Sequence, residues 1–122
     1  MAFSPRRSKF GVDNSEAGKL ARTYDGRLYA SKLEANYARE LDLRKGTKAI
    51  KDWSPQHRVP LVVNGKTITT MVIDFRVIHD DGSIELIETK GHETPDYKLK
   101  RKLFEALFPE AVYSIVKKGN IG

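Results

Sequence analysis

The chain has 122 residues, no cysteine and a formal net charge of +6 at pH 7, with 39% apolar and 31% charged residues. This length and composition predict one soluble globular domain with a single core, and no apolar run reaches the ~18 residues of a membrane span. The N-terminus lacks the apolar segment of a secretory signal, and without cysteine there are no disulfides, thiolate metal sites or cysteine nucleophile, so we expect a cytoplasmic protein. The basic charge favours a polyanion, above all nucleic acid, as the partner.

A hairpin and a helix are predicted in the first half of the chain. Asp25-Gly26 stands between strand-forming residues, which indicates a tight β-hairpin. A helix is expected to begin after Ser31, a good N-cap residue, and to end at Gly46. Glu34 follows Ser31 by three residues and completes the pattern of a capping box, so this glutamate has a structural role available to it.

Three strands are predicted after this helix. Asn64-Gly65 joins a strand over residues 59–63 to a strand over residues 66–79, and Asp80-Asp81-Gly82 then turns the chain into a strand over residues 83–90. The first of these strands has a proline near its start, which indicates the edge of a sheet.

A second helix and a closing strand complete the predicted domain. The helix opens with Thr94 as N-cap and Pro95 at its first position, and a strand follows over residues 111–116. The helix is predicted to have an apolar face formed by Leu99, Leu103, Phe104 and Leu107. The basic residues Lys98, Lys100, Arg101 and Lys102 occupy the rest of its surface. The order hairpin-α-β-β-β-α-β predicts an α/β domain over residues 23–116, in which helices flank a mixed β-sheet.

The length of the Asp80-Asp81-Gly82 loop decides which side chains meet across the second hairpin. A two-residue loop would place Asp74 opposite Thr89. A three-residue loop, with Gly82 in the left-handed conformation, would place Asp74 opposite Glu88 and Val72 opposite Lys90. We favour the three-residue loop.

Opposed carboxylates on one sheet face repel each other unless a cation lies between them. Asp74 and Glu88 offer hard oxygen ligands of the kind that Mg²⁺ or Mn²⁺ binds while retaining several waters. Lys90 lies two residues after Glu88 and therefore on the same face, where it would orient or deprotonate an attacking water, or neutralise a developing phosphate charge. Together with a basic surface, this set indicates metal-assisted hydrolysis of phosphodiesters.

The stretch "VIDFRVIHDDGSIELIETKG" resembles the D-x(n)-E-x-K core of the PD-(D/E)xK nuclease superfamily, the fold of restriction enzymes and several phage junction resolvases. The resemblance extends to "YASKLEANYA", similar to the glutamate-bearing first helix, to "SPQHRVPL", similar to the next strand, and to "ETKGHETPDYKLKRKLF". The pattern is most similar to a family of small phage-encoded proteins of uncharacterised function that are regarded as endonucleases, and it spans residues 24–115. It departs from the superfamily motif at Ile73, where proline is usual before the aspartate.

This resemblance implies a restriction-endonuclease-like core and a set of site residues. Asp74 and Glu88 would bind the metal, the carbonyl of Thr89 would be a further ligand, and Lys90 would be the catalytic lysine. Glu34 would complete the metal site, unless it only caps its helix. Gln56 and His92 are auxiliary candidates with less specific roles.

The expected activity is Mg²⁺-dependent cleavage of DNA, with branched or junction DNA as the substrate by analogy with the phage resolvases. Two active sites on one branch would require a homodimer, and a phage-encoded enzyme would act in the cytoplasm of its host. Phosphate contacts are expected from the second helix and from Arg6 and Arg7, which lie in a segment over residues 1–22 predicted to be a flexible basic arm; residues 117–122 are predicted to be a tail. Two alternatives stay open: a nicking nuclease that a partner protein, such as another phage protein, directs to its target, and a non-catalytic nucleic-acid-binding module.

Overall fold

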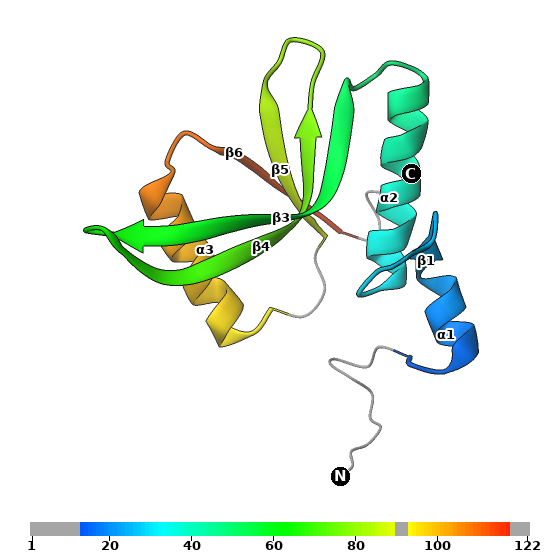
Figure 1. Cartoon of the computed structure of the whole chain (residues 1–122), viewed down its shortest axis with the longest axis horizontal. Helices are drawn as coiled ribbons and strands as arrows, with labels where there is room; N and C mark the ends of the chain where they lie inside the picture. The colour runs from blue at the N-terminus through cyan, green and yellow to red at the C-terminus, as the bar shows by residue number, and fades with distance from the viewer. Residues whose placement is uncertain (1–12, 90–92, 118–122) are drawn as a thin grey trace.

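The computed structural model describes residues 13–89 and 93–117 of the chain. In this part the elements are α1 (Glu16–Ala21), β1 (Thr23–Tyr24), β2 (Arg27–Leu28), α2 (Lys32–Gly46), β3 (Asp52–Val63), β4 (Lys66–Ile78), β5 (Ile84–Thr89), α3 (Pro95–Leu107) and β6 (Val112–Val116) (Figure 1). β1 and β2 pair with each other, and the remaining strands form one sheet in the order β3-β4-β5-β6. β3, β4 and β5 are antiparallel and β6 runs parallel to β5, so the expected mixed sheet with flanking helices is confirmed. No helix within the described ranges is long and apolar enough to span a membrane.

The predicted turns have the backbone conformations that their sequences require. Asp25 and Gly26 have φ values of 53° and 79°, and Asn64 and Gly65 have 51° and 79°, as two-residue hairpin loops demand. At the next hairpin Gly82 has a φ of 88°, and the His79 amide donates to the Ser83 carbonyl at 2.9 Å. The loop therefore holds three residues, and it pairs Phe75 with Ile87 and Val77 with Glu85, as predicted.

The structure corrects the sequence analysis in three places. Part of the predicted N-terminal arm is helical, since it contains α1. Ser15 is the N-cap of this helix, and its side chain accepts a hydrogen bond from the Gly18 amide. β3 begins at Asp52 rather than near residue 59, which puts Pro60 inside the strand; β3 is the edge of the sheet, where a missing amide donor is tolerated. On α3, Leu99 is 67% exposed instead of joining an apolar face, and Tyr97 packs inward together with Phe104.

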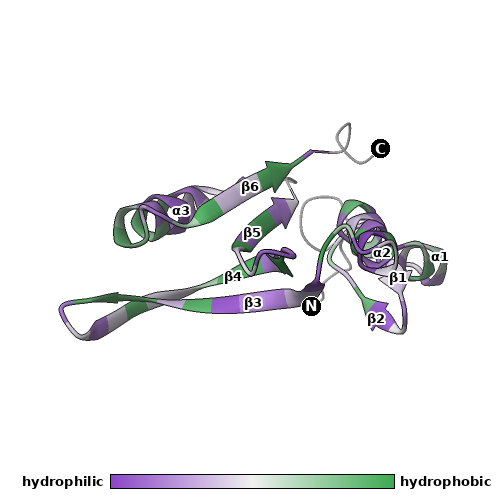
Figure 2. Cartoon of the chain, turned by 90° about the horizontal axis from the view of Figure 1, so that it is seen from above, coloured by the Kyte–Doolittle hydropathy of each residue, from purple (hydrophilic) through white to green (hydrophobic). Residues whose placement is uncertain are grey.

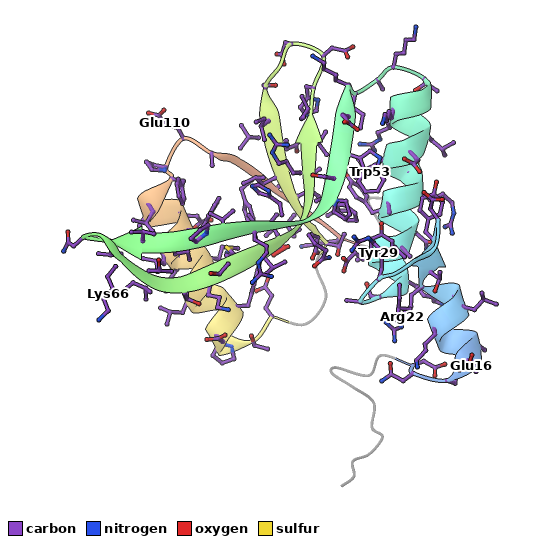
Figure 3. All side chains as sticks on the ribbon, viewed as in Figure 1. Glu16, Arg22, Tyr29, Trp53, Lys66 and Glu110 are labelled. Atoms are coloured by element: carbon purple, nitrogen blue, oxygen red, sulfur yellow. The ribbon has the colours of Figure 1, made fainter. Side chains whose placement is uncertain are left out.

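Two apolar clusters lie under the two main helices, which Figure 2 shows well apart, α2 beside β1 and α3 beside β6. The cluster under α2 centres on Phe75, whose ring lies 5.7 Å from that of Trp53. Trp53 points from β3 towards α2 (Figure 3). The cluster under α3 contains Phe104 and residues of β3, β4 and β5: Leu61, Met71, Ile73 and Leu86.

The long β3–β4 hairpin bends where it leaves the sheet. Ile73 packs in the cluster under α3 and Phe75 in the cluster under α2, although residues two apart on a straight strand share a face. Between them lies Asp74, and on the neighbouring strand Gln56 has a φ of 54°, a left-handed conformation that breaks the regular strand. Beyond this bend, residues 57–63 and 66–73 continue as a two-stranded ribbon that crosses α3, called the β-ribbon below (Figure 1).

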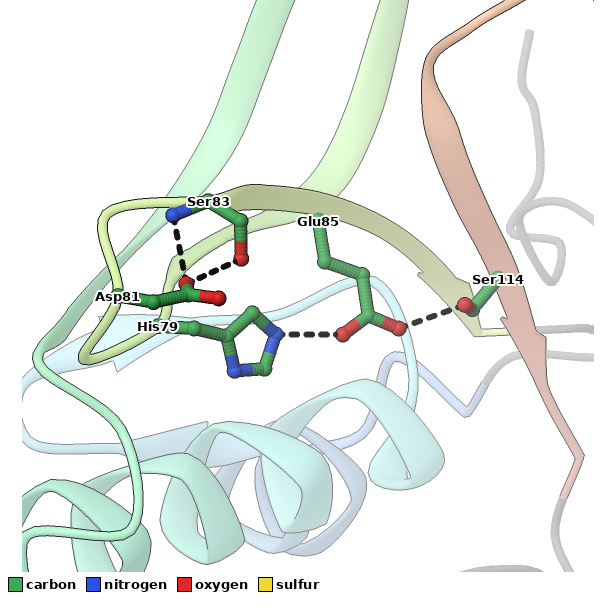
Figure 4. A network of polar contacts seen from close by, with 5 residues as sticks. All are labelled: His79, Asp81, Ser83, Glu85 and Ser114. Carbon is green, nitrogen blue, oxygen red and sulfur yellow. Dashed lines mark hydrogen bonds and ion pairs between the residues drawn. The ribbon is translucent and has the colours of Figure 1, made fainter.

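A polar network ties the other end of β4 to β5 and β6. The Glu85 carboxylate contacts His79 Nε2 at 2.8 Å and accepts from the Ser114 hydroxyl at 2.6 Å (Figure 4). In the adjoining turn, the Asp81 carboxylate accepts from the Ser83 amide and hydroxyl. This half of the sheet is therefore cross-linked through side chains, and the bend at Asp74 marks its boundary.

Candidate active site

Three carboxylates from three different elements converge at the bend of the hairpin. They belong to Glu34 of α2, Asp74 of β4 and Glu88 of β5. Glu34 is 3% exposed and Glu88 is 7% exposed, while Asp74 is half-buried. Burial raises the pKa of Glu88, and the charges of Asp74 and Glu34 raise it further, so the three acids lie within electrostatic reach of each other. The structure thus brings together the three acidic residues that the sequence analysis singled out.

Asp74 and Glu88 are joined by a hydrogen bond from the backbone of one to the side chain of the other. The β4–β5 ladder ends at the pair Phe75–Ile87, and the same register continued by one residue places Asp74 opposite Glu88. There the Asp74 amide donates to Glu88 Oε1 at 2.9 Å. In return, the Thr89 amide and hydroxyl donate to Asp74 Oδ2 at 2.9 and 2.8 Å. Carboxylates therefore replace main-chain carbonyls as acceptors at the point where the strands separate.

Glu34 reaches the site from the first turn of α2. The Ser31 hydroxyl accepts from the Glu34 amide at 3.1 Å, so the predicted N-cap is present. The Glu34 carboxylate accepts from Gln56 Nε2 on β3 at 2.8 Å, and a further hydrogen bond comes from the Ala30 backbone amide. Capping of the helix and a place in the acidic cluster are therefore compatible, because the amide serves the cap and the carboxylate extends to β3.

Burial raises the pKa of each of these acids, and the charge of Asp74 raises the pKa of Glu34 and Glu88 further. Burial, followed by the charge of Asp74, raises the pKa of Glu34 to about 8, although hydrogen bonds from Gln56 and Ala30 and the charge of Arg27 oppose the shift. Burial and then Asp74 likewise raise the pKa of Glu88 to about 8. Burial also raises the pKa of Asp74, against the hydrogen bonds from Thr89 and from Glu88. Within the described part of the chain no ion pair involves any of the three acids.

The donor set fits a hard divalent cation that keeps much of its water. In residues 13–89 and 93–117 no group of three or more histidine, aspartate or glutamate side chains is arranged so that it could hold a metal ion. Asp74, which is half-buried, and Glu88, which is buried, nevertheless supply a pair of carboxylates with raised pKa values, and Mg²⁺ is commonly bound through one or two carboxylates with water in its other positions. A bound cation would also reduce the repulsion among the three carboxylates.

Several predicted site residues fall outside this cluster or outside the described residues. Lys90, His92, Arg6 and Arg7 belong to the undescribed part. On α3, Lys100 lies 3.7 Å from Asp96 and Arg101 lies 3.7 Å from Glu93, whereas Lys98 and Lys102 are exposed. The basic face of α3 is therefore partly neutralised by its own acids.

Two tyrosines near Glu88 were not anticipated from the sequence. The hydroxyls of Tyr97 on α3 and Tyr113 on β6 are 2.7 Å apart. Burial first, and then among other causes the charge of Glu88, raises the pKa of both. No local pattern marks these residues, since they meet only through the packing of α3 on β6.

Comparisons with known proteins assign a family. No curated protein and no solved structure shows a significant match to the chain. Residues 14–120 match the family described as protein of unknown function, DUF1064, which covers all of the described elements. The chain belongs to the DUF1064 family.

Proposed function

We propose that this protein is a metal-dependent endonuclease that hydrolyses phosphodiester bonds in DNA. The observation that carries the proposal is the convergence of Glu34, Asp74 and Glu88 at the end of the β4–β5 ladder, with every pKa raised. Buried acids of this kind are costly in a purely structural role, and perturbed carboxylates cluster at functional sites. The basic net charge of +6 supports a polyanionic substrate.

In this proposal each residue of the site has a separate task. Asp74 and Glu88 hold Mg²⁺ or Mn²⁺, with Glu34 and the Thr89 carbonyl as further oxygen donors. The metal, when bound, supplies an activated water and neutralises phosphate charge. Thr89 fixes Asp74 through its amide and hydroxyl, and Gln56 fixes Glu34. Lys90 orients the water and receives its proton, and His92 contacts the phosphate.

The finer parts of the proposal rest on the resemblance to PD-(D/E)xK nucleases and phage junction resolvases. The fold is proposed to be a restriction-endonuclease-like core, and the substrate branched or junction DNA. A homodimer would supply one active site for each of two strands, and a phage-encoded enzyme would act in the cytoplasm of its host. Lys98, Lys102, Arg6 and Arg7 would contact phosphates.

The test is incubation of the protein with four-way junction, flap, duplex and single-stranded DNA, in Mg²⁺ and in EDTA. We expect EDTA-sensitive cleavage, greatest on branched DNA, that Lys90→Ala abolishes. Lys51→Ala is the matched control, because Lys51 is exposed and precedes β3 at the end of the strand far from the bend. Cleavage retained by Lys90→Ala contradicts the mechanism. Cleavage of none of the four substrates favours a binding module, or a nicking nuclease that needs a partner protein.

A further inference from the structure

The β-ribbon has one supported face and one exposed face. Leu61, Met71 and Ile73 lie on its inner side and are buried with Phe104 of α3. Because side chains alternate along a strand, the residues between them point away from α3. Helix α3 therefore supports the ribbon from behind, and no described element covers its outer face.

The outer face combines aliphatic side chains with an arginine. Val62, Ile68 and Val72 are 42%, 54% and 36% exposed. Arg58 is also exposed and lies directly opposite Val72 in the β3–β4 register. Apolar exposure of this kind on a paired ribbon indicates a surface that contacts another molecule.

The charge of the ribbon has a single sign. No aspartate or glutamate occurs from Trp53 to Ile73, while Arg58 lies on the outer face and Lys66 lies at the tip of the ribbon, opposite Val63. Both basic side chains are exposed, and neither forms an ion pair with another described residue. At the base of the ribbon, burial and then the charge of Arg76 lower the pKa of His57. Arg76 is therefore a third cation, and it lies close to His57. This charge distribution is complementary to a polyanion.

The shape of the ribbon matches a DNA groove. Residues 57–63 extend for about 20 Å at the usual rise of ~3.3 Å per residue, and two paired strands fit the major groove of B-DNA, which is ~12 Å wide. In such a groove, aliphatic side chains meet the thymine methyl groups of the floor, and basic side chains meet the phosphates of the rims. The ribbon begins at Gln56 and Asp74, so a duplex on it lies beside the acidic cluster.

We propose that the outer face of the β-ribbon docks into the major groove of duplex DNA and holds the duplex beside Glu34, Asp74 and Glu88. This inference rests on the proposed function, which identifies the bound polyanion as DNA. It adds that the protein recognises the major groove of a duplex. A second copy of the chain is the competing occupant. In a two-fold interface, however, each ribbon would bring its Arg58 and Lys66 against an equally acid-free surface, which charge repulsion disfavours.

Fluorescence anisotropy in EDTA tests the docking surface without cleavage. The probes are a labelled duplex of about three helical turns, or ~30 base pairs, and one of its single strands. The test variant is Arg58→Ala with Lys66→Ala, and the charge-matched control is Lys19→Ala with Lys51→Ala, both of which are exposed and lie outside the ribbon. We expect the test variant to lower the salt slope of log K by about 1.8 and duplex affinity by about 10-fold to 60-fold at ~0.1 M salt.

A negative charge introduced on the aliphatic face gives a second readout. Ile68→Glu alters a 54% exposed side chain, and we expect it to weaken duplex binding while leaving the circular dichroism spectrum and the melting temperature as in the wild type. Equal loss of affinity in the test and control variants overturns the proposal. It is likewise overturned if Ile68→Glu binds the duplex normally, or if sedimentation shows a wild-type dimer that Ile68→Glu converts to monomer.

The two proposals can fail separately in these experiments. Wild-type protein that binds duplex through the ribbon but cleaves no DNA in Mg²⁺ supports the docking surface and contradicts the nuclease. EDTA-sensitive cleavage by the wild type, together with ribbon variants that bind duplex as well as the wild type does, supports the nuclease and contradicts the docking surface.

Discussion

Raising the pH without metal should destabilise the folded protein. Burial, with the charge of Asp74, raises the pKa of Glu34 and of Glu88 from 4.5 to about 8. Between these values the folded chain keeps protons that the unfolded chain has released, so the free energy of unfolding falls as the pH rises. For one such glutamate the loss from about pH 5.5 to about pH 8.5 is about 3 kcal/mol, a large part of the ~5–15 kcal/mol that stabilises a small domain.

Urea unfolding in EDTA at these two pH values measures the effect. Trp53 is the single tryptophan and packs on Phe75, so its fluorescence reports the loss of the core. Glu88→Gln removes one titrating group and should flatten the pH dependence by about 3 kcal/mol. Glu105→Gln, an exposed glutamate on α3, is the matched control and should leave it unchanged.

Addition of Mg²⁺ at the higher pH should restore stability, because a cation that binds only the folded state stabilises it by about 1.4 kcal/mol at ten times its Kd. A metal-free protein that is as stable at about pH 8.5 as at about pH 5.5 would refute the reasoning. So would a pH dependence that Glu105→Gln flattens as much as Glu88→Gln.

Three further substitutions test the local structure around the site, each by urea unfolding at neutral pH. Thr89→Val keeps the shape of the side chain but removes the hydroxyl that donates to Asp74, and should cost about 1 kcal/mol; no change would mean that the 2.8 Å bond is not formed in solution. Gly82→Ala should cost about 1–2 kcal/mol, because a φ of 88° is unfavourable for alanine, and a neutral result would argue against the three-residue loop. Phe75→Ala should cost about 3–5 kcal/mol and shift Trp53 emission to longer wavelength, and a loss under ~1 kcal/mol would contradict the central place of Phe75 in its cluster.

Features governed by neighbouring residues could be predicted from the sequence. Asn64-Gly65 and Asp25-Gly26 specify tight hairpins, because few other dipeptides accept two consecutive left-handed residues. The three-residue loop ending at Gly82 then fixes Asp74 opposite Glu88. The core of the candidate site thus depends on turn chemistry, which can be predicted from the local sequence.

The role of Gln56 depends on an irregularity that no local pattern reveals. A regular hairpin closed by Asn64-Gly65 would pair Gln56 with Ile73. The register instead shifts between Leu61 and Val62, and this shift places Gln56 level with Asp74, where it reaches Glu34. A shift of one residue moves a side chain to the other face of a sheet, so a single bulge decides whether Gln56 belongs to the site.

Helix α1 was missed because its sequence carries no periodic signal. None of the residues of α1 is buried, so the helix has no apolar stripe that a pattern search would detect. The approach of Glu34 to the other acids could be expected only by resemblance, since it follows from the packing of α2 on Phe75 and its neighbours. Contacts between distant segments are the part of this site that sequence patterns leave open.

Divalent-cation binding by Asp74 and Glu88 underlies the proposed activity, and Mn²⁺ titration followed by electron paramagnetic resonance measures it without any DNA. We expect saturable Mn²⁺ binding that Mg²⁺ displaces, that Asp74→Asn and Glu88→Gln each abolish, and that Glu105→Gln retains. Binding that persists in both site variants, or wild-type protein that binds no Mn²⁺, would contradict the assignment of this acidic cluster as a metal centre.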